Sequence, residues 1–292
     1  MDEDKYPSAS GRRRFIKGLV GSSALATVGT AGTGLVEFTT NPSGVGGGSV
    51  QAKVIENVDG PAPRGMSQVP LEIEDGYLKG IWPGDVANGG SGGASGERNA
   101  SDGPSEATDA ESGPAEAATA TIAGVEYSSK WFQYCGVEGH PKLEPGSDAD
   151  NFLRSDGKSL YTWQSEVEGG AKLTVDQFAD YEEWHNGVGD EGLGKPAAAT
   201  WRSEETDATM PVQVIRSPRI EELAQEDDWL AATTERGFIA WLNKCTHFCC
   251  VPSGFKQTTT AENEVYCQCH QSVYDPFSVT ESVFKARPRP TE

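Results

Sequence analysis

The feature that most constrains this chain is a cluster of cysteine and histidine residues in two short stretches near its end. KCTHFCC covers residues 244–250, and YCQCHQSVYD covers residues 266–275. Each stretch supplies thiols and an imidazole, the side chains that bind zinc, copper and iron–sulfur centres. Five of the six cysteines lie between residues 245 and 269. The sequence therefore predicts one metal site that is built from two loops.

Three kinds of metal centre can be compared with this pattern. Zinc fingers place two cysteines together and two histidines together, whereas each loop here carries both types. A four-ligand zinc site would also leave further cysteines of the loops without a metal. Blue copper takes two histidines, one cysteine and usually a methionine, and Met1, Met66 and Met210 lie far from the loops in sequence. An asymmetric [2Fe–2S] cluster accounts for the ligand types, their order and the pairing of the loops. We favour this cluster, and zinc remains the alternative.

With these motifs the chain resembles the Rieske iron–sulfur proteins of quinol-oxidising cytochrome bc complexes. The family's loops read Cys-Thr-His-Leu-Gly-Cys and Cys-Pro-Cys-His-Gly-Ser-x-Tyr-Asp, and the corresponding stretches here are CTHFCC and CQCHQSVYD. Residues 199–222 also look like the strand pair that precedes the cluster in the family. The resemblance covers residues 199–290, and it implies an all-β fold with an antiparallel base and a small cluster-binding part.

The resemblance also implies one [2Fe–2S] cluster per chain and its four ligands. Cys245 and Cys267 would bind one iron, and His247 and His270 would bind the other. The two histidines would also be the catalytic residues, because a ligating imidazole can accept a hydrogen bond and then a proton from a quinol. Two neutral imidazoles in place of two thiolates raise the reduction potential of such a cluster.

Four other residues take their roles from the same resemblance. Cys250 and Cys269 match the family's disulfide between the two loops. Ser272 matches a serine that donates a hydrogen bond to a cluster sulfide, and Tyr274 matches a tyrosine that donates to a ligand sulfur. Both hydrogen bonds withdraw electron density from the cluster, so they would raise its potential further.

The chain also departs from the family. Cys249 stands where the family has glycine, so it is a second candidate beside Cys250 for the disulfide; otherwise it would remain free or pair with Cys135. KARPRP at residues 285–290 looks like the proline-rich loop that covers the cluster. The family usually has further strands after this loop, and we expect residues 121–200 to supply them unless the domain is shortened.

The N-terminus resembles a twin-arginine export signal. Arg12 and Arg13 lie in GRRRFIK, so residues 1–17 are expected to be the basic region of the signal. The uncharged stretch that follows is long enough to cross a hydrocarbon core as a helix, and residues 18–38 are expected to remain as a transmembrane anchor. Cleavage at SALA, residues 23–26, is the alternative. The folded part would then lie on the extracytoplasmic side of the cell membrane.

Composition divides the rest of the chain. Residues 39–120 include a tract rich in Gly, Ser and acidic residues, which predicts a flexible linker, although residues 54–85 have enough apolar residues for a strand or two. Short apolar runs with aromatic residues follow, so we expect a β-rich Rieske domain over residues 121–292. Its cluster-binding part would cover about 237–292. The clearest strand candidates are residues 211–217, 229–234 and 237–245, and residues 173–185 are expected to form a short helix.

The formal net charge of −20 is spread along the whole chain. Such a surface repels nucleic acids, so no nucleic-acid partner is expected. The charge fits a halophilic protein, because concentrated salt screens the repulsion between like charges. Together with the resemblance, it suggests a haloarchaeal protein.

The function implied by the resemblance is electron transfer. The chain would take one electron and one proton from a quinol beside a cytochrome b-type subunit, and would pass the electron to a cytochrome c or a small blue copper protein. It would be one subunit of an oxidoreductase complex and would not be catalytic alone. The alternatives are a Rieske ferredoxin or oxygenase, the small Rieske subunit of an arsenite-oxidase-like molybdenum enzyme, and a zinc-stabilised exported binding module. His140 and His185 are expected to have ordinary surface roles.

Overall fold

The computed structural model describes residues 47–87, 117–139, 143, 150–157, 160–203 and 210–288. They all belong to the compact unit Ser43–Glu292, one of two into which the chain divides. The predicted signal and anchor, residues 1–38, lie outside the described residues, and so do residues 88–116 of the predicted linker. Among the helices that the structure describes, none is long and apolar enough to cross a membrane.

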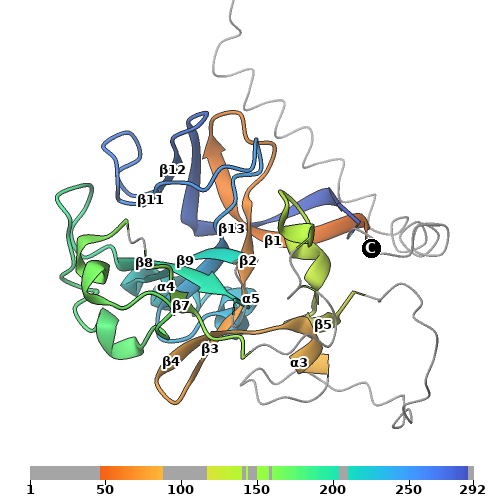
Figure 1. Ribbon diagram of the computed structural model, residues 1–292, viewed down its shortest axis with the longest axis horizontal. Coiled ribbons are helices and arrows are strands. Elements are labelled where there is room, and N and C mark those ends of the chain that lie inside the picture. Colours follow the sequence, from red (N-terminus) through yellow and green to blue (C-terminus); the bar gives the residue numbers. More distant parts are fainter. Residues whose placement is uncertain are drawn as a thin grey trace, which may run out of the picture. The chain divides into compact units, whose positions relative to one another are not determined.

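One curled antiparallel sheet dominates the described part of the chain (Figure 1). Counted over the described residues, it has nine strands in the order β11-β12-β13-β1-β2-β10-β9-β8-β7. The short strand β2 joins its two halves, because it pairs with β1 on one edge and with β10 on the other. The all-β prediction is confirmed at this level. The strands are β1 (Gly48–Asp59), β2 (Met66–Val69), β7 (Arg154–Ser155), β8 (Lys195–Trp201), β9 (Met210–Arg216), β10 (Phe238–Leu242), β11 (Gly254–Phe255), β12 (Val265–Cys267) and β13 (Ser272–Ala286).

Two hairpins and several short helices complete the described structure. The hairpins are β3 (Leu71–Glu74) with β4 (Tyr77–Gly80), and β5 (Thr119–Ile122) with β6 (Val125–Ser128). The α-helices are α3 (Pro83–Ala87), α4 (Pro218–Leu223) and α5 (Asp228–Thr233), and the 3-10 helices are η2 (Ser129–Phe132), η3 (Val137–Gly139), η5 (Thr162–Glu166) and η6 (Val175–Phe178).

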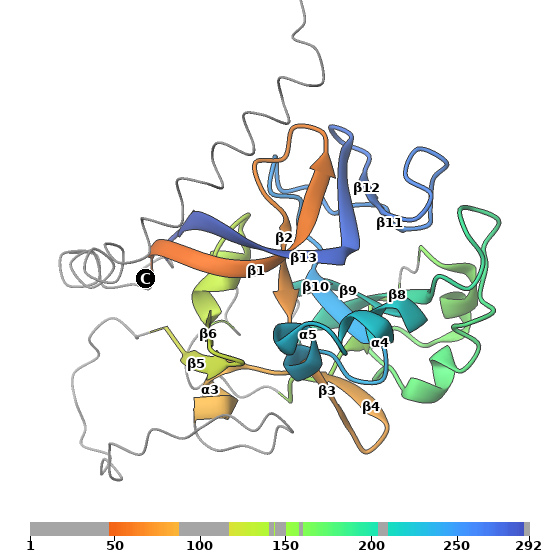
Figure 2. The same cartoon turned by 180° about the vertical axis from the view of Figure 1, so that it is seen from behind.

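The longest pairing in the sheet joins the start of the described chain to its end. β1 lies antiparallel to β13, with Gly48 opposite Ala286 and Ile55 opposite Val279 (Figure 2). Val50, Ala52 and Val54 of β1 are buried and alternate with more exposed residues, which is the period-two pattern of a strand with one face on the core. Residues 48–80 contain four strands. The strand or two expected within residues 54–85 are therefore present, whereas the prediction of a flexible linker is wrong for this stretch. The strand beside β13 comes from residues 48–59 rather than from residues 121–200.

Two other local predictions are also wrong. Residues 229–234 were expected to form a strand, but they belong mostly to α5. The Asp227 carboxylate accepts a hydrogen bond from the backbone N–H of Leu230, and this cap starts the helix. Residues 173–185 contain the 3-10 helix η6 followed by turns, rather than one α-helix. The strands predicted at 211–217 and 237–245 are present as β9 and β10.

Large aromatic side chains fill much of the core. Trp131, Trp201 and Trp241 are fully buried, and the ring of Phe132 lies 5.3 Å from that of Trp201. Fully burying such a large apolar side chain stabilises a fold by about 2–3 kcal/mol. This core supports the ends of β10, β12 and β13, where the cysteine and histidine residues gather.

Candidate metal centre

Two loops carry the predicted ligands, and adjoining strands hold both of them. The first loop, residues 243–253, leaves β10, and the second loop, residues 268–271, joins β12 to β13. In the first loop the N–H of Cys245 donates to the carbonyl oxygen of Cys250 at 2.8 Å, and the N–H of Cys249 donates to that of Cys245 at 3.0 Å. In the second, the N–H of Gln271 donates to the carbonyl oxygen of Cys267 at 2.9 Å. Both loops are thus closed by their own backbone.

All six cysteines lie in the described part of the chain, and four of them form disulfides. Cys245 and Cys267 are the two free cysteines, and both are fully buried. Burial raises the pKa of the Cys267 thiol to about 11, and Cys245, which lies within hydrogen-bonding reach, raises it further. Two buried neighbouring thiols are therefore left at the predicted ligand positions. The disulfides are Cys250–Cys269 and Cys135–Cys249.

One of these thiols, that of Cys267, lies close to a disulfide. The Sγ atoms of Cys250, Cys267 and Cys269 are within 4.8 Å of one another. Because Cys250 and Cys269 are bonded to each other, their sulfurs are not thiolate ligands, and only Cys267 of this group can bind a metal ion. The disulfide therefore packs against a candidate ligand.

The two predicted histidine ligands also lie side by side. The ring centroids of His247 and His270 are 4.8 Å apart, with the ring planes at 84°. Nδ1 of His247 is buried, and it has no hydrogen-bond partner among the described residues. A buried polar atom without a partner costs about 1–3 kcal/mol, so a metal ion at this nitrogen would satisfy it. His270 is exposed, and the exposed Phe248 lies against both rings.

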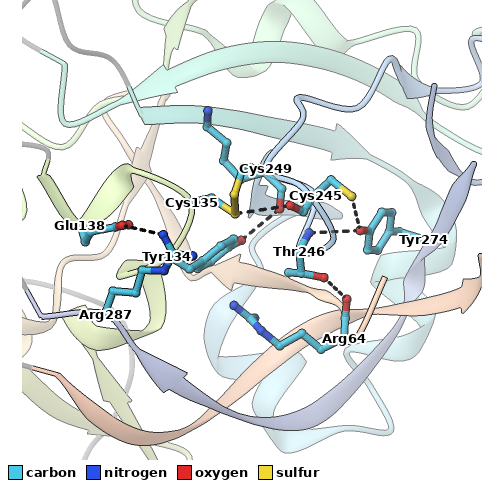
Figure 3. The surroundings of a disulfide bond; sticks show 10 residues. Arg64, Tyr134, Cys135, Glu138, Cys245, Thr246, Cys249, Tyr274 and Arg287 are labelled. Atoms are coloured by element: carbon cyan, nitrogen blue, oxygen red, sulfur yellow. Dashed lines mark hydrogen bonds and ion pairs between the residues drawn. A yellow bond between two sulfur atoms is a disulfide. The ribbon is translucent and has the colours of Figure 1, made fainter. Parts of the chain in front are cut away.

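Tyr274 lies near the start of β13, and its buried side chain reaches the first loop. Its hydroxyl group donates to Sγ of Cys245 at 3.1 Å and accepts from the N–H of Thr246 at 3.4 Å (Figure 3). Burial, followed by the hydrogen bond to Cys245, raises the pKa of Tyr274. The phenol therefore stays protonated at neutral pH and directs its proton at a candidate ligand sulfur.

Ser272 lies at the start of β13, directly after the second loop, and it is fully buried. Its hydroxyl oxygen accepts a hydrogen bond from the N–H of Ala62 at 3.2 Å. The hydroxyl proton is therefore available for an acceptor on the other side. Ser272 and Tyr274 thus bring one hydroxyl group each to the region of the candidate ligands.

The sequence did not predict a further loop that contacts Ser272 and the first loop. Residues 60–65, here called the covering loop, connect β1 to β2. The hydroxyl group of Thr246 donates to the carbonyl oxygen of Arg64, so the covering loop contacts the first loop as well as Ser272. A Cβ atom on Gly60, which has φ +84°, would come within 2.5 Å of the carbonyl oxygen of Gln271. Only glycine allows this close approach to the second loop.

The side chain of Arg64 fixes the other end of the covering loop. Its guanidinium carbon lies 3.7 Å from the ring centroid of Phe284 and 4.4 Å from that of Tyr134. Burial lowers the pKa of Arg64, and an arginine side chain is charged at neutral pH. These stacking contacts hold the loop against β13 and the segment that follows η2.

Residues 285–290 were expected to cover the centre, and the contacts of Arg287 lie with the segment that follows η2. The backbone N–H of Arg287 donates to the carbonyl oxygen of Gln133 at 2.9 Å, and its guanidinium lies 3.5 Å from the carboxylate of Glu138. Residues 60–65 contact both ligand loops, at Thr246 and at Gln271. A sequence signal for the covering loop was present: residues 60–63 read GPAP, which is typical of a turn. It lay in the segment that was expected to be a linker.

No protein-family model, curated protein or solved structure gives a significant match to this chain. The site therefore rests on its own geometry. The remaining described histidine, His185, lies outside it: Nε2 is 3.0 Å from the carbonyl oxygen of Gly189, and Nδ1 is 3.8 Å from the carboxylate of Glu191. His140 lies outside the described residues.

Proposed function

We propose that this chain binds one [2Fe–2S] cluster and transfers electrons as a Rieske iron–sulfur protein. Cys245 and Cys267 would hold one iron, and His247 and His270 would hold the other. One observation carries the proposal: four cysteines pair in disulfides, and the two that remain are buried beside each other at the predicted ligand positions. The unpartnered Nδ1 atom of His247 fits the same assignment.

The bound cluster would supply a one-electron acceptor. His270 is exposed, so its imidazole can accept a hydrogen bond from a quinol hydroxyl group and then hold the proton. Tyr274 directs its proton at Cys245, and the thiols of Cys245 and Cys267 are both buried. The hydrogen bond from Tyr274 would favour the reduced state of a bound cluster, because hydrogen bonds to ligand sulfur withdraw electron density from it.

The surroundings of His270 support a partner that brings the quinol. Phe248 of the first loop is 67% exposed and its ring lies 5.0 Å from that of His270, so an apolar surface lies next to the exposed imidazole. Such a surface suits a cytochrome b-type subunit that completes a quinol site. The electron would then pass to a cytochrome c or a small blue copper protein.

Two disulfides suit an oxidising environment, in keeping with export through the twin-arginine signal. We therefore place the folded part on the extracytoplasmic side of the cell membrane, held by residues 18–38. The acidic surface suits a saline medium, in which like charges are screened.

The first experiment is the EPR spectrum of the dithionite-reduced full chain, together with analysis of iron, acid-labile sulfide and zinc. We expect iron and sulfide in equal amounts and a rhombic signal with an average g value below that of an all-cysteine cluster. Zinc without an EPR signal would overturn the proposal and would leave a metal-stabilised binding module. Quinol oxidation with a cytochrome b partner would follow a positive result.

A further inference from the structure

The first loop is fastened at two adjacent positions to two different parts of the protein. Cys250 is bonded to Cys269 of the second loop, 19 residues away in sequence. Cys249 is bonded to Cys135, 114 residues away, in the segment that follows η2 (Figure 3). The first bond ties the two ligand loops to each other, whereas the second ties the first loop to the rest of the fold.

The segment that carries Cys135 is firmly anchored. Trp131 of η2 is fully buried, and its carbonyl oxygen accepts a hydrogen bond from the hydroxyl group of Ser67 at 2.8 Å. Tyr134 is buried, and its hydroxyl group lies 3.4 Å from the carbonyl oxygen of Lys244, at the start of the first loop. Cys135 is therefore attached to the core and lies against the loop that it is bonded to.

The disulfide also acts directly on the backbone of a candidate ligand. The N–H of Cys249 donates to the carbonyl oxygen of Cys245, and Sγ of Cys135 lies 3.5 Å from the same oxygen. Because a disulfide sulfur has no proton, this second approach is a packing contact. The carbonyl group of Cys245 is thus held between the two half-cystines.

Both half-cystines have a backbone conformation that L-residues disfavour. The φ angle of Cys135 is 59° and that of Cys249 is 62°, which lie in the left-handed region that glycine adopts most readily. The bond between their side chains restrains both residues in this conformation. The bond therefore offsets part of the cost of this conformation at Cys249.

We propose that Cys135 and Cys249 are positioning residues for the metal centre. Their disulfide holds the first loop in its ligand-binding conformation independently of Cys250–Cys269, so either bond alone is sufficient to keep the metal. This inference rests on the proposed function, since it concerns the centre that the loops would bind.

The test is a double-mutant cycle on the full chain, with the two disulfides removed separately and together. One variant is C250S/C269S, the second is C135S/C249G and the third combines all four changes. Glycine suits the positive φ at position 249, so the second variant leaves no strained residue in the first loop at that position once the bond is lost. The measurements are the metal content as purified and the rate of metal loss to a chelator, with far-UV circular dichroism as the check on folding. Non-reducing peptide mapping of the unchanged protein establishes both pairings.

We expect each double variant to keep its metal and to lose it to the chelator about tenfold faster than the unchanged protein, while the quadruple variant is purified without metal. Three results would overturn the inference: free thiols at Cys135 and Cys249, complete loss of metal from C250S/C269S alone, or a C135S/C249G protein that releases metal as slowly as the unchanged one. Absence of iron from the unchanged protein would instead refute the proposed function, before any variant is compared.

Discussion

The hydroxyl group of Tyr274 lies 3.1 Å from Sγ of Cys245 and donates a hydrogen bond to it across the gap between β13 and the first loop. Replacement of Tyr274 by Phe removes one donor and keeps the ring. We expect the metal centre to form and its reduction potential to fall by on the order of 50 mV, because a hydrogen bond to a charged sulfur contributes about 1–2 kcal/mol.

A redox titration followed by EPR measures this shift. The matched control is Tyr127→Phe, which removes another buried hydroxyl group, bonded at 2.7 Å to the carbonyl oxygen of Ile81. The control should lower the free energy of unfolding without changing the potential. Equal potentials in Tyr274→Phe and the unchanged protein would show that the hydrogen bond does not tune the centre.

Replacement of His270 by Ala should abolish the metal centre rather than weaken it. The imidazole is exposed, so its loss should leave folding almost intact while one candidate ligand disappears. Iron content and the visible spectrum measure the effect. His185→Ala is the control, because its ring bonds to Gly189 outside the site. A His270→Ala protein that retains its full iron content would remove this residue from the ligand set.

Replacement of Gly65 by Ala should disturb the covering loop. An added Cβ atom would come within 1.9 Å of the carbonyl oxygen of Ile55 and 2.7 Å of a methyl carbon of Val54, so the loop has to move. We expect the free energy of unfolding to fall by about 2 kcal/mol or more, and metal loss to a chelator to become faster.

Chemical denaturation measures the first effect, with Gly76→Ala as the comparison. Gly76 has φ +84° and nothing within 4 Å of an added Cβ atom, so its replacement should cost only about 1 kcal/mol of backbone strain. Equal destabilisation of the two variants would argue against a tightly packed covering loop.

Replacement of Glu264 by Gln should raise the free energy of unfolding at neutral pH. Burial raises the pKa of the Glu264 carboxyl group, and the negative charges of Asp275 and Asp59 raise it further. A group with a higher pKa in the folded state binds protons more tightly there, so its ionisation costs stability as the pH rises through that pKa.

The gain should be about 0.5 kcal/mol at pH 7 in low salt, since solvent screens a half-exposed charge. It should vanish below pH about 4, where Glu264 is protonated in both states, and should shrink in concentrated salt. Denaturation curves at two pH values and two salt concentrations provide the test. A gain that persists at pH 3 would point to packing rather than charge.

Local chemistry determined part of this structure in advance. The spacing of Cys245 and His247, and of Cys267 and His270, placed a thiol and an imidazole on each of two loops, and β9 and β10 were evident from short apolar runs. These signals are local, because neighbouring residues decide the turn and the strand period. The same local reasoning failed at residues 229–234, where one capping carboxylate on Asp227 outweighed the β-branched and aromatic residues.

The sequence by itself determined the four candidate ligands and a mostly β fold, and the export signal stays a prediction. Only the tertiary structure decided that β1 pairs with β13, that residues 60–65 cover the site and that Cys249 pairs with Cys135. These three features join segments more than a hundred residues apart. Such contacts form because the whole sheet buries its apolar faces together. The composition of a single segment therefore carries little information about which distant segment it will contact.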